Sequence, residues 1–254
     1  MSDTINQKHY SGVVAEWYDA LIESEENDIK YYQKFAEESK GPVLELACGT
    51  GRLLFPYLKE GVQIDGVDVS EEMLEICKKK IDSMGLKSNL YMQDIADLDL
   101  PKQYQTIFIA GGSFQLISSF QRALRAMKKI YNHLLPGGKF VVDIFRPLDR
   151  DNIIQDGLWV KGREAQNHLG KKIIVYGSNK NNIDEQLIKG LYKYELYDND
   201  RLTDTMIGEI YLRWYGKYEF EMMLEKAGFK NIKMEMNEII TVHGKAFVFT
   251  AEKE

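Results

Sequence analysis

The chain has 254 residues, which is enough for one large α/β domain or for one domain with a modest insertion. Its composition, 44% hydrophobic and 28% charged, is typical of a soluble globular protein. A formal net charge of -6 argues against a partner with a phosphate backbone, so we expect no nucleic-acid partner.

Cysteine usage and the N-terminal segment exclude further classes. Cys48 and Cys77 lie in no metal-type spacing and no clustered histidines accompany them, so we expect neither a disulfide framework nor a metal site. The N-terminal segment MSDTINQKHYSG is polar and has no apolar signal core. Apolar runs stay well short of the ~20 residues that span a bilayer. We therefore expect a cytoplasmic protein with no membrane contact.

Residues 1–40 precede the first predicted strand. Apolar residues recur at helical spacing over 13–22 and over 27–39, so we expect two helices appended over the main sheet. Tyr10, Trp17 and Tyr18 either pack in this layer or face a site.

The stretch VLELACGTGRLL, residues 43–54, joins a short apolar strand to a helix through a turn with Gly49 and Gly51. Glycines allow the backbone to approach a ligand closely, and a helix start offers free N–H groups. This strand, turn and helix predict an anion- or nucleotide-binding loop.

Strands and helices then alternate regularly as far as residue 145. A capping box from Ser118 to Gln121 predicts the start of one helix, and Ser70 is expected to cap another. Strands are expected at 43–47, 63–69, 89–92, 106–110 and 139–145. This alternation predicts a parallel sheet with helices on both faces.

The pattern changes after the fifth strand. Segments 158–167, 171–179, 186–198 and 206–214 are rich in aromatic and branched residues and predict antiparallel strands. A helix over 218–227 and two strands, 231–238 and 245–252, then resume the core, with the last strand antiparallel to its neighbour. We expect a core formed by 41–150 and 216–254, and an insertion over 151–215.

Acidic residues follow the predicted strands at the edge where ligands bind in such sheets. Glu45 precedes the glycine turn, Asp68 ends the second strand and Asp94 follows the third. A carboxylate at Asp68 can accept two hydrogen bonds from a ribose diol. Taken singly, Asp68 and Asp94 are also compatible with helix caps or turns.

These residues resemble a known family. ELACGTG, residues 45–51, resembles the first motif of the class I S-adenosylmethionine-dependent methyltransferases, Asp68 their ribose-binding acid, and 93–95 (Gln-Asp-Ile) their adenine-binding motif. LLPGGKFVVD, residues 134–143, is similar to their turn into the fifth strand. The resemblance covers roughly 40–145 and 215–252. Ala47 departs from the pattern, which has a glycine there.

The resemblance implies an α/β fold: a doubly wound, seven-stranded Rossmann-like sheet with an antiparallel final strand, and an antiparallel β subdomain inserted after the fifth strand. It implies S-adenosyl-L-methionine as cofactor, with residues 1–40 covering its site. The implied cofactor-binding residues are Glu45, Ala47, Gly49, Gly51, Arg52, Asp68, Val69, Met73, Asp94, Ile95, Ala110 and Trp17. A dinucleotide-binding fold is the structural alternative, but it requires a third glycine near Leu54 and does not account for Asp94.

GGSFQL, residues 111–116, resembles the corresponding segment of glycine N-methyltransferase-like and sugar-amine N-methyltransferase-like enzymes. We therefore expect in-line methyl transfer to a small-molecule acceptor, nitrogen ahead of oxygen, with the insertion as an acceptor lid or a dimer face. The candidate acceptor-site residues, whose catalytic roles are unassigned, are Tyr10, Tyr18, Ser113, Gln115 and Arg213.

Each candidate has a simpler structural explanation. The tyrosines can pack, Ser113 and Gln115 can bond within a turn, and Arg213 can form a surface ion pair. A macromolecular methyltransferase and a non-catalytic cofactor-binding scaffold stay as alternative functions, and the chain is expected to be a monomer or a homodimer.

Overall fold

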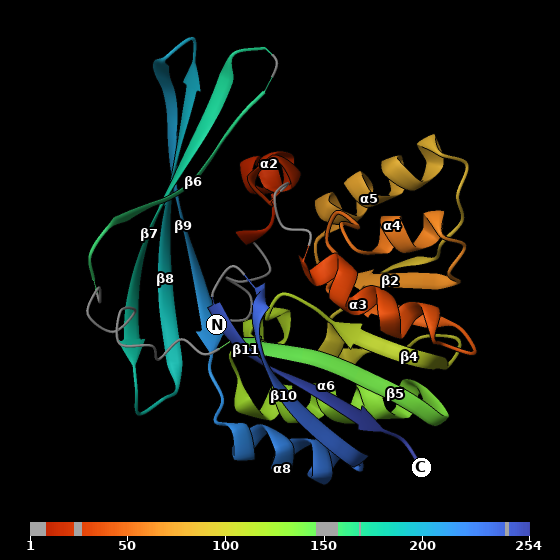
Figure 1. Cartoon of the computed structure of the whole chain (residues 1–254). Helices are drawn as coiled ribbons and strands as arrows, with labels where there is room; N and C mark the ends of the chain where they lie inside the picture. The colour runs from red at the N-terminus through yellow and green to blue at the C-terminus, as the bar shows by residue number, and fades with distance from the viewer. Residues whose placement is uncertain (1–8, 23–26, 146–156, 168, 242–243) are drawn as a thin grey trace.

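The computed structural model describes residues 9–22, 27–145, 157–167, 169–241 and 244–254. They form an α/β unit around a seven-stranded sheet and a separate four-stranded sheet (Figure 1). No helix in these ranges is long and apolar enough to cross a membrane.

The seven-stranded sheet has the order β10-β11-β5-β4-β1-β2-β3. Its central strands pair in parallel, whereas β11 runs antiparallel to both β5 and β10. This confirms the predicted fold, including its antiparallel final strand. The strands are β1 (Val43–Leu46), β2 (Ile64–Asp68), β3 (Leu90–Met92), β4 (Tyr104–Ile109), β5 (Leu134–Phe145), β10 (Lys230–Thr241) and β11 (Gly244–Glu252).

Helices cover both faces of this sheet because successive residues of its strands point in opposite directions. In β4, Ile107 and Ile109 pack in the apolar layer beneath two of the helices, while Phe108 packs on the opposite face. The helices are α2 (Val13–Ile22), α3 (Asn27–Glu37), α4 (Leu54–Lys59), α5 (Glu71–Ser83), α6 (Phe120–His133) and α8 (Lys217–Ala227), with short 3-10 turns η1 (Ile95–Asp97) and η2 (Ser113–Leu116).

The capping prediction is right for α5 and wrong for α6. Ser70 caps α5 by accepting a hydrogen bond from the Met73 N–H, as expected. In α6 the cap is Ser119, which accepts from the Arg122 N–H, so the predicted box beginning at Ser118 is shifted by one residue. The Ser118 carbonyl instead accepts a hydrogen bond from Arg213. Two adjacent serines cannot be separated by local sequence, and this long-range contact leaves Ser118 outside the helix.

The inserted sheet consists of β6 (Val160–Gln166), β7 (Lys171–Asn182), β8 (Leu187–Asp198) and β9 (Arg201–Arg213), all antiparallel. The last of these begins earlier than expected, since its pairing with β8 extends to a tight turn at 199–200.

Helix α2 is not where the sequence placed it. It was expected over the main sheet, but its buried Val14 and Trp17 form an apolar cluster with Ile173, Val175 and Tyr194 of the inserted sheet. Figure 1 shows α2 between this sheet and α5. Helical periodicity identifies an apolar face but not the surface that covers it. Helix α2 therefore joins the insertion to the core.

Candidate functional site

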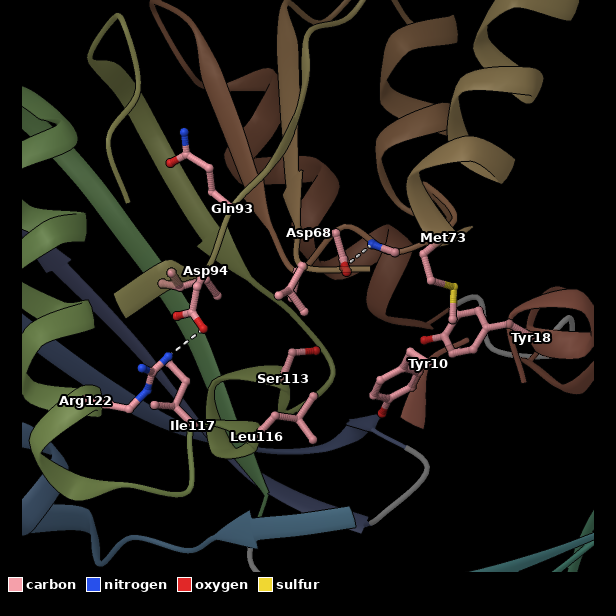
Figure 2. Close-up of a pocket in the computed structure, with 14 residues that line it drawn as sticks. Tyr10, Tyr18, Asp68, Met73, Gln93, Asp94, Ser113, Leu116, Ile117 and Arg122 are labelled. Carbon is pink, nitrogen blue, oxygen red and sulfur yellow. Dashed lines mark hydrogen bonds and ion pairs between the residues drawn. The ribbon is translucent and has the colours of Figure 1, made fainter. Parts of the chain in front are cut away.

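A cavity of about 120 Å³ opens at the carboxyl ends of β1, β2 and β3 (Figure 2). The polar part of its lining includes Asp68 and Asp94, and the apolar part includes Val69, Met73 and Ile95. All five residues were predicted to contact the cofactor from sequence. The topology thus brings side chains from three successive β-α connections to one cavity, as expected for a doubly wound sheet.

Asp68 is held by the backbone at the end of β2. Its Oδ2 accepts from the Gly49 N–H at 2.8 Å, and its Oδ1 accepts from the Ser70 N–H at 2.9 Å. Burial raises the pKa of this carboxyl, and the backbone N–H groups of Ser70 and Gly49 oppose that shift. Because a carboxylate has about four acceptor positions, two bonds leave capacity for a diol in the cavity.

Asp94 follows β3 and is part of an ion pair. Its Oδ1 caps η1 through the Ala96 N–H at 2.8 Å, and its Oδ2 lies 2.6 Å from the Arg122 guanidinium of α6. Figure 2 shows this pair on the opposite side of the cavity from Tyr10 and Tyr18. Asp94 therefore caps η1 and also lines the cavity. Arg122, which also lines the cavity, was not identified from sequence.

The two glycines of the loop after β1 have different surroundings. Gly49 lines the cavity and adopts φ +54°. Gly51 adopts φ +80°, and a Cβ there would lie 2.5 Å from the Cys77 Sγ of α5. Gly51 is absent from the lining of the described cavities, so it acts by letting α5 pack against the loop.

Ala47 also has a left-handed backbone, with φ +56°. This is the position where the sequence departs from the glycine of the resembling motif. Left-handed φ costs an L-residue about 1–2 kcal/mol. The chain therefore keeps the backbone shape that a glycine would give, with one methyl group facing the site.

Glu45 lies in the interior of β1 beside a buried ion pair. Its side chain is 3% exposed, and its Oε2 has no hydrogen-bond partner among the described residues. Burial raises the pKa of this carboxyl, and the nearby Arg52 opposes the shift. Both guanidinium NH groups of Arg52 bond to the carboxylate of Asp28. An unpartnered buried acceptor is costly unless a ligand donor reaches it.

Tyr10 and Tyr18 come from the N-terminal segment and lie side by side over the cavity, next to Met73 (Figure 2). Their rings meet edge to face, with centroids 6.1 Å apart. The segment is fastened to the core because the Ser70 hydroxyl donates to the Tyr10 carbonyl at 2.7 Å. Both tyrosines were candidates from sequence, and both reach the site.

A second cavity, of about 490 Å³, lies between the core and the inserted sheet. Glu45, Arg52, Ala110 and Ser113 line it from the core. Five residues line both cavities: Tyr10, Tyr18, Ala47, Ser113 and Leu116. Gly49 lines only the smaller one. The two cavities therefore adjoin.

Besides Gly51, three predicted site residues lie outside the lining of the two cavities. Trp17 packs among Val14 and Ile173 and is absent from the lining of either cavity. Gln115 is fully buried, donates to the Phe145 and Arg213 carbonyls and accepts from the Phe145 N–H. Arg213 donates to the Ser118 carbonyl at 2.7 Å. Gln115 and Arg213 thus join η2 to the ends of β5 and β9 through long-range hydrogen bonds to backbone groups, in place of the turn bond and the surface ion pair that were the simpler alternatives.

Asp143 of β5 is a contributor that the sequence analysis missed. It is fully buried and accepts from the Tyr32 hydroxyl at 2.5 Å and from the N–H groups of Gly111 and Gly112 at 2.8 and 2.7 Å. Burial raises its pKa to about 6 against these donors. The signal was one acid inside the apolar run FVVDIF. Asp143 fixes the turn that brings Ser113 to the site.

The smaller cavity and its border fit S-adenosylmethionine. Asp68 offers acceptors for a ribose diol, Val69 and Ile95 offer apolar walls for a flat base, and Glu45 offers an unpartnered oxygen for an ammonium group. Among the residues that the structure describes, no group of three or more His, Cys, Asp or Glu side chains is placed to hold a metal ion.

Comparison with known proteins agrees with this site. The sequence profile of a methyltransferase domain family matches residues 43–138. YqeM of Bacillus subtilis, named as a methyltransferase, is 24% identical over 218 residues, which cover 84% of this chain and 83% of YqeM. A Geobacillus protein with a similar name is 24% identical over 161 residues, or 61% of this chain and 65% of that protein, so the chain spans less than two thirds of this relative.

Solved structures share the fold. An S-adenosylmethionine-dependent methyltransferase from Clostridium acetobutylicum superposes with a TM-score of 0.74 at 21% identity, covering 94% of this chain and 97% of that one. The sugar N-methyltransferase KedS8 from Streptoalloteichus superposes with a TM-score of 0.75 at 16% identity, covering 96% and 93%. Residues 43–138 thus match a methyltransferase domain family, and the described chain shares the fold of solved S-adenosylmethionine-dependent methyltransferases.

Proposed function

We propose that this protein transfers a methyl group from S-adenosylmethionine to a nitrogen atom of a small-molecule acceptor bound in the larger cavity. The observation that carries the proposal is the junction of the two cavities at Tyr10, Tyr18, Ala47 and Ser113. A cofactor held by Asp68 and an acceptor beneath the inserted sheet would meet there. The volume of the larger cavity, about 490 Å³, and its position between the core, α2 and the inserted sheet support a small acceptor.

The cofactor supplies a methyl group already activated by a sulfonium centre. The protein's contribution is therefore alignment and the exclusion of water. Tyr10 and Tyr18 cover the junction from one side, and Leu116 and Ser113 border it from η2. The Ser113 hydroxyl donates to the Ala110 carbonyl at 2.7 Å, so its oxygen can still accept a hydrogen bond from an acceptor N–H.

A nitrogen acceptor agrees with the titratable groups on the cavity wall. A hydroxyl nucleophile benefits from a general base, whereas an amine needs only to be neutral. His9 lines the cavity, but burial lowers its pKa to about 4, against a weaker effect of the Glu209 backbone, which makes it a weak base. Asp28 is paired with Arg52. KedS8, which has the same fold, is a sugar N-methyltransferase, and this also supports nitrogen.

Calorimetric titration with S-adenosylhomocysteine tests the cofactor half of the proposal. Asp68→Ala should weaken binding at least ~30-fold, because two charge-assisted hydrogen bonds to a diol are lost. Asp82→Ala is the control, since this acid near the end of α5 is exposed and lines neither cavity. Absence of binding to the wild type, or equal binding to Asp68→Ala, would refute the assignment.

Turnover tests the acceptor half. A panel of primary and secondary amines, each matched with the alcohol of the same skeleton, is incubated with S-adenosylmethionine, and released S-adenosylhomocysteine is measured. We expect methylation of amines and little of the matched alcohols. Preferential methylation of alcohols would contradict the choice of nitrogen while leaving the cofactor site intact.

A further inference from the structure

We propose that the acceptor carries a planar ring, which stacks on Tyr192 at the inserted-sheet wall of the larger cavity. This inference rests on the proposed function, because it names the class of molecule that the acceptor cavity holds. It follows from an unusual arrangement of glycines around one tyrosine in the middle of β8.

Tyr192 has glycine as its partner on both neighbouring strands. It pairs with Gly177 of β7 and with Gly208 of β9. The residue two positions earlier on the same face of β8 is Gly190. Side chains directly opposite each other on adjacent strands normally lie ~5 Å apart and support one another. Neither neighbouring strand has a side chain opposite Tyr192, and Gly190 has none on the same face of β8.

The ring fills the space that these glycines leave. A Cβ built at Gly190 would lie 3.0 Å from the Tyr192 Cε2, and a Cβ built at Gly177 would lie 3.6 Å from its Cε1. Contacts at both edges of the ring, from two positions on one face of the sheet, mean that the ring leans over the sheet surface.

Tyr192 lines the larger cavity, and its ring also packs against the cluster that Val14 and Trp17 of α2 form with the inserted sheet. Next to it, the His9 ring lies over Gly208, where a Cβ would be 3.1 Å from Nδ1, and its centroid is 5.5 Å from that of Tyr192. Tyr194 follows, with centroids 6.5 Å apart and a 30° angle between the rings. Burial raises the pKa of the Tyr192 phenol, so the ring stays uncharged. His9, Tyr192 and Tyr194 together form an aromatic part of the cavity wall.

Glycine in a strand costs about as much as it does in a helix, and it often marks a position where a ligand approaches closely. In β7 and β8 the glycines at 177 and 190 border the Tyr192 ring, Gly208 of β9 makes room for His9 and Tyr194, and Gly162 of β6 also lines the cavity. Four aliphatic side chains, Val160, Val175, Ile210 and Leu212, lie on the same wall, together with the polar Arg163 and Asn179. A flat, weakly polar group matches this surface best, because offset stacking uses the whole ring face.

Two kinds of acceptor carry such a ring. It can be part of an aromatic amine that is itself methylated, or it can be the base of a nucleoside to which the methylated group is attached. Both would contact Tyr192 in the same way, and simple probes distinguish them.

Binding is measured by calorimetry on the full chain saturated with S-adenosylhomocysteine. The probes are 2-phenylethylamine, its saturated counterpart 2-cyclohexylethylamine, and thymidine. We expect 2-phenylethylamine or thymidine to bind about tenfold more tightly than 2-cyclohexylethylamine, and the tighter of the two identifies the kind of ring. Failure of both ring-bearing probes to bind more tightly than the saturated amine would overturn the inference.

Variants locate the contact. Tyr192→Phe should keep the preference for the flat ring, whereas Tyr192→Leu should abolish it. Gly162→Leu, which narrows the cavity from β6, should weaken every probe. Ile207→Ala is the control, since this residue of β9 is 69% exposed and does not line the cavity. An unchanged preference in Tyr192→Leu would also refute the inference.

Affinity for S-adenosylhomocysteine separates this inference from the proposed function. If S-adenosylhomocysteine does not bind, the proposed function fails. If it binds equally to the wild type and the Tyr192 variants while the ring-bearing probes show no preference, only the planar-ring inference fails.

Discussion

Gly51 offers a direct test of what the glycine loop does. The resembling motif assigns this residue to the cofactor, whereas the structure places it against Cys77, which is 1% exposed. Gly51→Ala introduces a methyl group at φ +80°, with a strain of about 1–2 kcal/mol. About 0.4–1 kcal/mol of this is offset, because alanine restricts the unfolded chain.

The new methyl group would lie 2.5 Å from the Cys77 Sγ, well inside ordinary van der Waals contact. Such overpacking costs about 1–3 kcal/mol, so the total destabilisation should be about 2–4 kcal/mol. Cys77→Ala alone should cost about 1 kcal/mol through the loss of a buried thiol. In the double variant the overlap disappears and only the strain and the lost thiol remain, about 2 kcal/mol in all.

Urea unfolding of the wild type, both single variants and the double variant at one pH measures this cycle. We expect the double variant to be about 1–3 kcal/mol more stable than the sum of the single effects predicts. Affinity for S-adenosylhomocysteine should fall in Gly51→Ala and recover in the double variant. Additive free energies, or an affinity that stays low in the double variant, would show that Gly51 serves the cofactor directly.

Three further predictions follow from buried or strained groups. Ala47→Gly removes left-handed strain and should raise the unfolding midpoint by about 2–4 °C in differential scanning fluorimetry; an unchanged or lower midpoint would contradict it. Asp143→Asn should destabilise the protein. The pKa of Asp143 is about 6 in the folded protein and about 3.9 in the unfolded chain, so its stabilising contribution is full below pH 4 and is lost as the pH rises through 6. In urea unfolding, Asp143→Asn should therefore cost about 2 kcal/mol more at pH 4.5 than at pH 7.5. A cost that does not depend on pH would refute the raised pKa. Gln115→Ala leaves the Phe145 N–H and the Arg213 carbonyl without their hydrogen bonds, so the free energy of unfolding in urea should fall by about 2–4 kcal/mol while the affinity for S-adenosylhomocysteine stays unchanged. Weaker S-adenosylhomocysteine binding with unchanged stability would show that Gln115 acts in the site.

Most of the residues around the smaller cavity could be predicted from sequence because they lie in consecutive β-α units. Glu45, Asp68 and Asp94 each follow or lie in a strand of one parallel sheet, and parallel strands bring their carboxyl ends to one edge. Apolar periodicity located those strands closely. The ordered sheet, its antiparallel last strand and the direction of these side chains then required no further information.

Contacts between segments far apart in the sequence could not be predicted from local patterns. Trp17 lies on the apolar face of α2, but nothing local says that this face meets β7 and not the main sheet. Arg213 is 95 residues from the Ser118 carbonyl to which it donates. Asp143 was visible as an acid in an apolar strand, yet its partners at Tyr32 and Gly111 come from two other parts of the chain. Each of these depends on tertiary packing that overrides a sound local pattern.

The same difference separates the two functions of the molecule. Most of the predicted cofactor residues that line the two cavities lie between Glu45 and Ile95, within consecutive β-α units. The larger cavity is lined by the N-terminal segment, the core and the η2 turn, and by the inserted strands, which form a separate sheet from the main one. Changes at Tyr192 or Gly162 can therefore alter the acceptor while leaving Asp68 and its backbone donors untouched. On this argument, acceptor identity is determined mainly by the inserted sheet, and its inner face is where experiments on specificity should begin.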